Sequence, residues 1–292
     1  MLSLPVQAKD SVDVIGFVDV LDVLTHIVRL CSEGKTHPEA DEAFENTIMM
    51  YQKGFNFAST PVSAIIDSSS RDPLVPVYGR GTLAQLIEEA FSRGVHRVPV
   101  YNRASTVVTN IISQSDIIKF IMGKMDEAGN PEAVLGSLMG KTVDELRLGT
   151  KPVVSMSGDL PAFKALQLMV RSRVSAVAVV DKVGQLMADF SATEVRGLSV
   201  DNFPSLRKPV ITFLEQSRSR IGRAECYPFS TPIICTGDTP IETVFLKLHM
   251  HGLHRLWIVD EMARPLGVIT LTDMMRLLLP PQEPLASTPL NM

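Results

Sequence analysis

The chain of 292 residues repeats one pattern, in which two short apolar strands joined by a polar turn are followed by a helix. Three copies end their first strand at Asn102, Asp181 and Asp260, and these residues follow one another at intervals of 79 residues. Similarity at a fixed period indicates one duplicated supersecondary unit, so the fold must be built from equivalent units. The copies span Gly94 to Met122, Arg173 to Leu198 and Gly252 to Leu279.

Each complete unit also begins with a strand and a helix, which gives the order β-α-β-β-α. Residues Ser59 to Asp67 are expected to supply one such first strand, and Thr82 and Gln85 have the spacing of a capping box at the start of the helix that follows. Thr239 and Glu242 repeat this spacing in the last unit. The strands are too uniformly apolar to leave a face in water, so the units are expected to pair. The predicted fold class is mixed α/β (α+β), with four repeats in two pairs.

The chain is expected to divide into four units and a tail. Residues 1–30 contain two strands and one helix, which correspond to the second half of a unit. We expect this first unit to be truncated, and a true half repeat is the alternative. The other units are predicted at residues 59–123, 146–200 and 227–279, and the proline-rich residues 280–292 are predicted to be disordered.

Composition excludes several classes of function. Apolar residues make up 45% of the chain and charged residues 21%, as in ordinary globular proteins. The net charge of -4 provides no field that would gather nucleic acid, and no apolar run approaches the roughly 20 residues that span a membrane. Three scattered cysteines favour a reducing compartment, so a cytoplasmic or nuclear location is expected.

No signature of catalysis or of a metal site is present. The chain has no glycine-rich phosphate loop, no G-x-S-x-G sequence, no H-E-x-x-H sequence and no kinase signature. His249, His251 and His254 do not share one helical face, and no carboxylate or cysteine completes a ligand set. We therefore expect a protein that is not an enzyme and that has no metal or cofactor.

A hydroxyl residue followed three residues later by an acid recurs where the second hairpin strand of a unit passes into its helix. Backbone N–H groups and the helix dipole favour an anion there, and a carboxylate can accept hydrogen bonds from a ribose diol. The alternative is that the hydroxyl caps the helix and the acid complements its dipole. In the first unit Asp19 takes the hydroxyl position, before Asp22. The pairs are Ser113 with Asp116, Ser191 with Glu194, and Thr270 with Asp273.

Basic pairs stand just before equivalent strands in two units. These pairs are His96-Arg97 and His254-Arg255, and Arg173 lies near the corresponding place in the third unit. Such side chains could converge on a phosphate, with arginine binding in a bidentate manner and histidine as a titratable donor. A polar start of a strand is the alternative explanation.

These repeats resemble cystathionine-β-synthase (CBS) domains, and their order resembles the gamma regulatory subunit of AMP-activated protein kinase and its fungal and plant relatives. The resemblance covers about residues 2 to 279. It is carried by HRVPVYN with IISQSDIIKFI, by KTVDELRLGT, by RVSAVAVVD with FSATEV, and by LHRLWIVDEMARPLGVITLTDMMRLLL.

The resemblance implies two paired modules that form a disc, with central clefts for AMP, ADP or ATP. Thr270 with Asp273, and Ser113 with Asp116, would then contact ribose, as would Ser191 with Glu194 in a third cleft. It also implies a regulatory subunit that senses cellular energy and assembles with a kinase catalytic alpha subunit and a scaffolding beta subunit. The phosphate contacts would come from His96, Arg97, Arg173, His254 and Arg255.

Four residues depart from the family pattern. Asp116 stands where animal gamma subunits usually have a basic residue, and Ser115 replaces a lysine. Glu194 replaces the usual aspartate, and Asp19 would repel a phosphate. A scaffold protein with degenerate clefts, which would hold kinase subunits together without sensing nucleotides, is therefore the alternative function.

Overall fold

The structure is a computed structural model, and it describes residues 3–9, 11, 13–32, 60–102, 107–196, 198, 202–220 and 232–280. The tail that was predicted to be disordered lies outside these residues, except for its first position. The first unit comprises residues 3–32, the second 60–128, the third 142–196 and the fourth 232–279. The first and second units are called the first module, and the third and fourth the second module.

Each unit contains an antiparallel hairpin with the same register. The first residue of each hairpin faces the residue that precedes the following helix, and the register shifts once before the fifth pair. The facing residues therefore mark equivalent positions: Ser3 with Asp19, Arg97 with Ser113, Ala176 with Ser191, and Arg255 with Thr270. The hairpins are β1 (Ser3–Gln7) with β2 (Val14–Asp19), β4 (Arg97–Tyr101) with β5 (Val108–Ser113), β7 (Ala176–Val180) with β8 (Leu186–Ser191), and β10 (Arg255–Val259) with β11 (Pro265–Thr270).

A third strand runs parallel to the first hairpin strand in three units. These strands are β3 (Val77–Tyr78), β6 (Ser155–Ser157) and β9 (Ile234–Cys235). The prediction of a first strand at Ser59 to Asp67 was wrong, because the described part of that stretch forms the 3-10 helix η2 (Val62–Ala64) and turns. Asp67 has a φ of 45° and its carboxylate accepts hydrogen bonds from the following loop, so the chain turns there and the strand begins later.

Helices flank the sheets. The first helix of a unit is α3 (Leu83–Glu89), continued by η3 (Phe91–Arg93), then α6 (Ala162–Ser172) and α8 (Ile241–Met250). The second is α1 (Val20–Ser32), α4 (Gln114–Ala128) and α9 (Leu271–Leu277), whereas the third unit has only the 3-10 helix η5 (Ala192–Val195). The connectors hold α5 (Glu132–Leu135), η4 (Gly136–Leu138), η6 (Phe203–Arg207) and α7 (Val210–Arg220).

One of the two predicted capping boxes is present. Thr82 and Gln85 cap α3 reciprocally, as predicted. The box at Thr239 and Glu242 was wrong, because Pro240 keeps an extended ψ of 146° and is itself the N-cap, so α8 starts one residue later than the spacing suggested. The Glu242 carboxylate instead accepts a hydrogen bond of 3.2 Å from the backbone N–H of Gly140.

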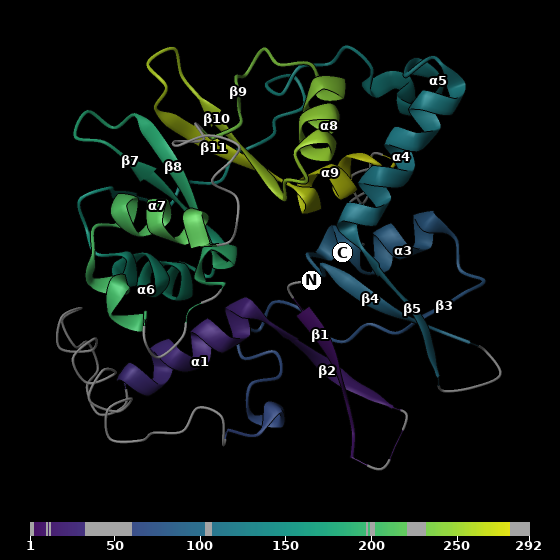
Figure 1. Cartoon of the computed structure of the whole chain (residues 1–292). Helices are drawn as coiled ribbons and strands as arrows, with labels where there is room; N and C mark the ends of the chain where they lie inside the picture. The colour runs from purple at the N-terminus through teal and green to yellow at the C-terminus, as the bar shows by residue number, and fades with distance from the viewer. Residues whose placement is uncertain are drawn as a thin grey trace, which may run out of the picture.

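The units form a ring in the order first, second, fourth, third (Figure 1). Hydrophobic contacts make three of its junctions, and hydrogen bonds from Asp67 and Ser69 to Phe17 and Asp22 join the second unit to the first. One core joins the second and fourth units through α3, α4, α8 and α9. A second core joins the first and third units through α1, α6 and α7. Within the second module the sheets pack face to face through Ala178, Trp257 and Val259. The mixed α/β fold with paired units was therefore predicted correctly. The ends of its strands point toward a common centre, which is called the centre of the ring (Figure 1).

Candidate functional site

The two His-Arg pairs meet at the centre of the ring. The backbone carbonyl of His96 accepts a hydrogen bond of 3.0 Å from the N–H of Gln114, and that of His254 accepts one of 3.2 Å from the N–H of Leu271. Each pair therefore lies beside the start of the second helix of its own unit. The charges of His96 and Arg97, which belong to the first module, act on His254 in the second module. That these pairs converge on a phosphate stays a prediction.

His254 lies among positive charges. Desolvation, followed by the charges of Arg255, His96, Arg97 and Arg196, lowers the pKa of His254 to about 4. The side chain is nevertheless exposed, so its desolvation is incomplete and the surrounding cations are the firmer cause. A cluster of this kind is favourable for an anion that would lie among these groups.

Arg173 does not occupy the position of these arginines. The hairpin register places Ser175 and Ala176 at the positions of the two His-Arg pairs. Arg173 ends α6 instead, where it has a φ of 52° and an exposed side chain. Its phosphate role stays a prediction, although the interval of 79 residues between equivalent strand ends could have placed Ser175 and Ala176 at these positions.

Arg255 is held in place by the third unit. Its Nη2 donates a hydrogen bond of 2.9 Å to the hydroxyl of Ser175, and its Nη1 lies 3.3 Å from the carboxylate of Asp189. The same carboxylate accepts a hydrogen bond of 3.1 Å from Nε1 of Trp257, which is 3% exposed and belongs to the core, as predicted. The guanidinium group of Arg255 is therefore oriented at the contact between the two sheets of the second module.

The hydroxyl-acid pairs of the second and fourth units have the same geometry. One oxygen of Asp116 accepts hydrogen bonds from the N–H of Ser113 at 2.9 Å and from its hydroxyl at 2.7 Å. Asp273 binds Thr270 at the same two distances. Both pairs are capping boxes, so the capping interpretation is correct for their structure. It does not exclude ribose binding, because a carboxylate has further acceptor capacity.

The second oxygens of these carboxylates differ. Oδ1 of Asp273 lies 3.2 Å from Nη1 of Arg276. Asp116 is exposed, and among the described residues its Oδ1 forms no hydrogen bond. Both helix starts could therefore take a ribose hydroxyl, with Asp116 the more open of the two.

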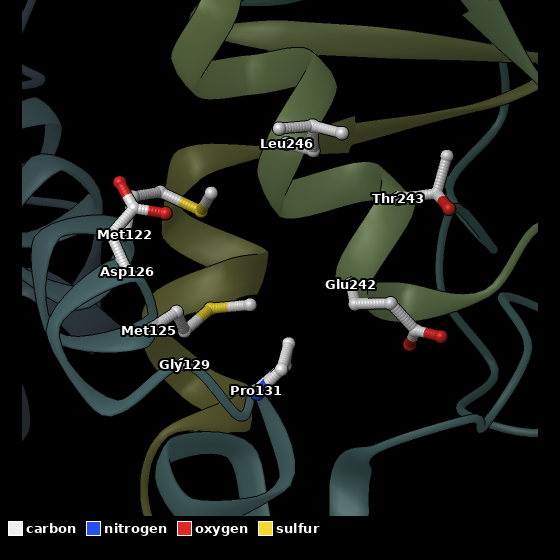
Figure 2. Close-up of a pocket in the computed structure, with 8 residues that line it drawn as sticks. All are labelled: Met122, Met125, Asp126, Gly129, Pro131, Glu242, Thr243 and Leu246. Atoms are coloured by element: carbon white, nitrogen blue, oxygen red, sulfur yellow. The ribbon is translucent and has the colours of Figure 1, made fainter.

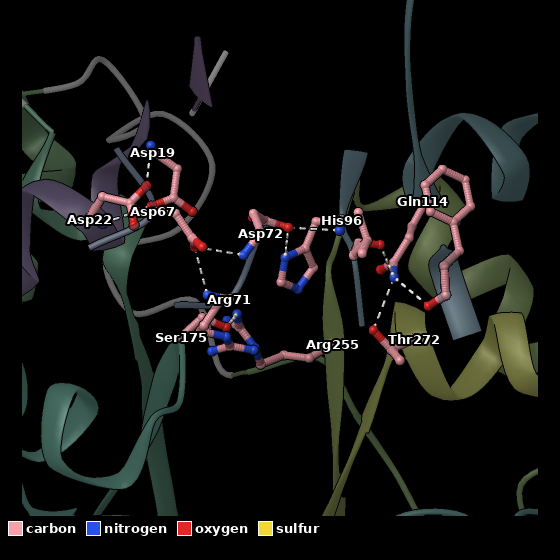
Figure 3. Close-up of polar contacts among 12 residues, drawn as sticks. Asp19, Asp22, Asp67, Arg71, Asp72, His96, Gln114, Ser175, Arg255 and Thr272 are labelled. Atoms are coloured by element: carbon pink, nitrogen blue, oxygen red, sulfur yellow. Dashed lines mark hydrogen bonds and ion pairs between the residues drawn. The ribbon is translucent and has the colours of Figure 1, made fainter. Parts of the chain in front are cut away.

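Gln114 joins these two helix starts. It is 2% exposed, and its Nε2 lies within hydrogen-bond distance of the carbonyls of Phe91 and Val95 and of the hydroxyl of Thr272, which is 3.0 Å away (Figure 3). Gln114 directly follows Ser113, and Thr272 lies two residues after Thr270. The two candidate ribose sites are therefore adjacent and share a buried polar contact.

The third unit departs from this geometry. The hydroxyl of Ser191 lies 2.6 Å from that of Thr193 and accepts a hydrogen bond from the N–H of Thr193. Glu194 lies on the short η5, is 8% exposed, and has its backbone carbonyl bound by the hydroxyl of Ser217. Because η5 is a 3-10 helix, the hydroxyl of Ser191 accepts its cap hydrogen bond from Thr193, two residues on, and not from the residue three positions on. The ribose role of Ser191 and Glu194 stays a prediction.

In the first unit Asp19 and Asp22 cap each other. Each carboxylate accepts a hydrogen bond of 2.8 Å from the N–H of the other residue, and Asp22 also binds the N–H of Ser69. Burial and the charges of Asp22 and Asp72 raise the pKa of Asp19 to about 6, against an opposing effect of Arg97. Negative charge therefore concentrates where the first unit meets the second.

Replacing Asp19 with asparagine is expected to stabilise the protein at neutral pH. Because the folded state raises the pKa of Asp19 from 3.8 to about 6, the folded state binds a proton more tightly, and its stability falls as pH rises through that window. The variant should gain about 1 kcal/mol at pH 7 and no advantage below pH about 4. Urea unfolding at both pH values measures this, and an equal effect at both would contradict it.

Sequence reasoning missed Arg71 and Asp72, which reach the centre from the loop before β3 (Figure 3). Asp72 is 4% exposed, and its Oδ1 accepts a hydrogen bond of 2.8 Å from the N–H of His96 and lies 2.8 Å from Nδ1 of the same residue. Contacts with His96 and the charge of Arg97 hold the pKa of Asp72 below its ordinary value despite burial. The dipeptide lies in no regular element, so only its charges could have marked it.

A separate pocket lies away from the centre, between α4, the loop that follows α4, and α8 (Figure 2). It is lined by Met122, Met125, Asp126, Gly129, Pro131, Glu242, Thr243 and Leu246.

Within the described ranges, no group of three His, Cys, Asp or Glu side chains could hold a metal ion. No described helix combines the length and the hydrophobicity needed to cross a membrane.

Three segments of the chain match the family model of the CBS domain, at residues 62–123, 143–197 and 225–280. The chain therefore belongs to the CBS-domain family. The prediction of tandem CBS repeats is confirmed by this match and by the fold.

Relatives of the chain carry the name Sds23. Protein SDS23 of Scheffersomyces stipitis is 28% identical over 232 residues, which are 79% of this chain and 43% of that protein. Protein sds23 of Aspergillus niger is 28% identical over 253 residues, which are 85% of this chain and 48% of that protein. The chain thus spans less than half the length of these relatives. They are not named as gamma subunits, so the resemblance is confirmed only at the level of tandem CBS domains.

A solved structure shares the fold over nearly the whole chain. Protein MJ1225 from Methanocaldococcus jannaschii, described as a candidate archaeal homologue of g-AMPK, has a TM-score of 0.63 with this chain. The match covers 94% of this chain and 87% of that protein at 16% sequence identity. At this identity the likeness establishes the fold alone.

Proposed function

We propose that the chain is a non-catalytic regulatory protein that binds AMP, ADP or ATP, with the phosphate groups at the centre of the ring. One observation carries the proposal. The two His-Arg pairs, one from each module, lie close enough for His96 and Arg97 to depress the pKa of His254. Each pair also adjoins a helix start that bears a hydroxyl-acid pair. Cations for phosphate and carboxylates for ribose are the two groups that a nucleotide requires.

The four candidate clefts differ in their chemistry. Asp273 and Asp116 provide carboxylates at the starts of α9 and α4, and these two sites are proposed to bind nucleotide. Asp19 and Asp22 of the first unit, together with Asp72 of the second, place negative charge where these two units meet. Like charges repel, so nucleotide is expected to bind weakly or not at all there.

We further propose that the chain is a gamma-type subunit of an AMP-activated or SNF1-related protein kinase in the cytoplasm or nucleus. The order of the four units and the ring fold support this assignment, while the relatives named Sds23 leave the partner open. Capture of kinase catalytic and scaffolding subunits by the tagged full chain tests it. A scaffold that does not sense nucleotides is the second candidate, and the acidic group around Asp19 favours it.

Calorimetric titration of the purified chain with AMP, ADP and ATP tests the proposed function. Binding in the micromolar range would support a nucleotide sensor, and the stoichiometry would count the working clefts. A folded chain that binds none of the three would support the scaffold instead.

Nucleotide binding is expected to be coupled to proton uptake by His254. Neighbouring cations and desolvation hold its pKa at about 4, so the imidazole is neutral at pH 5.5. A bound phosphate would offset those cations and raise the pKa toward its ordinary value, so the complex should take up a proton at pH 5.5 and much less at pH 8. Titration of AMP in buffers with different ionisation enthalpies measures this uptake, and His254→Gln should abolish it. Uptake that persists in this variant would contradict the assignment.

A further inference from the structure

Two arginines from different modules lie side by side at the centre of the ring. Arg71 belongs to the second unit and Arg255 to the fourth, and Figure 3 shows them next to each other beside Ser175. Desolvation is the first cause that lowers the pKa of Arg71, and the charge of Arg255 lowers it further, against the attraction of Asp72 and Asp19. The folded protein thus places two like charges together where water screens them poorly.

One carboxylate already pairs with Arg255, because Nη1 of Arg255 lies 3.3 Å from Asp189, which also accepts a hydrogen bond from Trp257. The carboxylates near Arg71 make hydrogen bonds elsewhere, Asp72 with His96 and Asp19 with the N–H of Asp22. Among the described residues, Nη1 of Arg71 is buried without an acceptor. Nε of Arg97 is also buried without one. Oδ2 of Asp72, whose charge acts on Arg71, is buried without a partner in the described part of the chain as well. Buried donors of this kind are costly and rare, and a bound anion could accept a hydrogen bond from Nη1 of Arg71.

We propose that Arg71 and Arg255 bind the same phosphate group and that this phosphate fastens the first module to the second. The inference rests on the proposed function, and it adds a binding residue and a regulatory consequence to it. A phosphate monoester or diphosphate between two guanidinium groups can accept hydrogen bonds from both, which turns a repulsive contact into an attractive one. Without the anion, repulsion between Arg71 and Arg255 loosens the contact between the modules.

The test compares Arg71→Met with Arg80→Met, which removes an exposed arginine from the turn between β3 and α3 of the same unit. Arg71→Met should weaken AMP binding at least about tenfold and leave adenosine binding unchanged, since adenosine has no phosphate. Arg71→Lys keeps the charge but loses the planar fork, so it should weaken AMP binding by about threefold. Arg80→Met should change neither affinity.

Thermal unfolding without ligand is a second measurement, in which Arg71→Met is expected to raise stability although it lowers the affinity for AMP. Arg71→Met should raise the midpoint, because it removes a desolvated charge and its repulsion from Arg255, whereas the gain in midpoint on adding AMP or pyrophosphate should shrink. A merely structural Arg71 would give a lower midpoint without ligand, or a variant that does not fold. Either result would overturn the inference, as would unchanged AMP affinity.

Pyrophosphate separates this inference from the proposed function. If the wild type binds pyrophosphate in a manner that depends on Arg71 but binds no nucleotide, the proposed function fails and the phosphate contact stands. If the wild type binds AMP and Arg71→Met binds it equally well, the contact fails and the proposed function stands. A wild type that binds neither overturns both.

Discussion

Replacing Asp273 with alanine is expected to lower the affinity for AMP by about a hundredfold. The carboxylate would accept hydrogen bonds from the ribose diol, and hydrogen bonds to a charged group contribute about 1.5 to 3 kcal/mol each. The variant also leaves the hydroxyl of Thr270 without its 2.7 Å acceptor. Calorimetric titration with AMP measures the loss.

The change at Asp273 also breaks a capping box, which by itself costs about 1 kcal/mol of stability. Gln85→Ala is the matched control, because it breaks the box of α3 away from the hydroxyl-acid sites. Both variants should lose similar stability in urea, but only Asp273→Ala should lose AMP affinity. Equal AMP binding by Asp273→Ala and the wild type would contradict the ribose assignment.

Gly267→Ala is expected to destabilise the protein by about 3 kcal/mol, which is at the upper end for overpacking. A Cβ atom at this position in β11 would lie 2.1 Å from the backbone oxygen of Gly149 and 2.9 Å from its carbonyl carbon. Backbone cannot move aside as the end of a long side chain can, so the turn at Gly149 would have to move away from β11. The free energy of unfolding in urea measures the cost.

Gly123→Ala is the control for this prediction. Gly123 lies inside α4, and a Cβ atom there would meet nothing within 4 Å. Alanine should therefore stabilise the helix by about 0.5 to 1 kcal/mol. Opposite signs are thus expected for the same substitution at two glycines, and a neutral Gly267→Ala would show that the two backbones do not need this close approach.

The repeating part of the fold could be predicted from the sequence, because its signals are local. Apolar runs with polar turns indicated all four hairpins, and the common period made the equivalence of three of them visible. The buried residues of α8, Ile241, Val244, Phe245 and Leu248, follow helical spacing and could also be identified. The short strands before the first helices could not, because two or three residues such as Val77 and Tyr78 give no periodic pattern.

The candidate site was predicted in part for similar reasons. The His-Arg pairs stand at the starts of β4 and β10, which share one register, so the duplication predicted that the pairs occupy equivalent positions. Arg71 and Asp72 reach the centre from an irregular loop, and Asp189 reaches Arg255 from the neighbouring unit. Such contacts depend on how the units pack, which a linear pattern does not contain. Arg173 illustrates the converse, because a basic residue near the right place does not share the register position of Arg97 and Arg255.

The pairing of the units suggests how bound nucleotide could act. The centre takes side chains from both modules, so a ligand bound there would contact both modules and would have a different affinity for a closed and a loosened ring. A ligand shifts an equilibrium only by such a difference. Gln114 would add a direct connection between the clefts at Ser113 and Thr270, through its bond to Thr272.

The central claim is that the basic residues at the ring centre bind nucleotide phosphate, and titration of AMP into the wild type and into the double variant Arg97→Gln, Arg255→Gln tests it most directly. We predict micromolar binding by the wild type and loss of binding by the double variant, with both proteins folded by circular dichroism. No binding by the folded wild type, or equal binding by the double variant, would contradict the account.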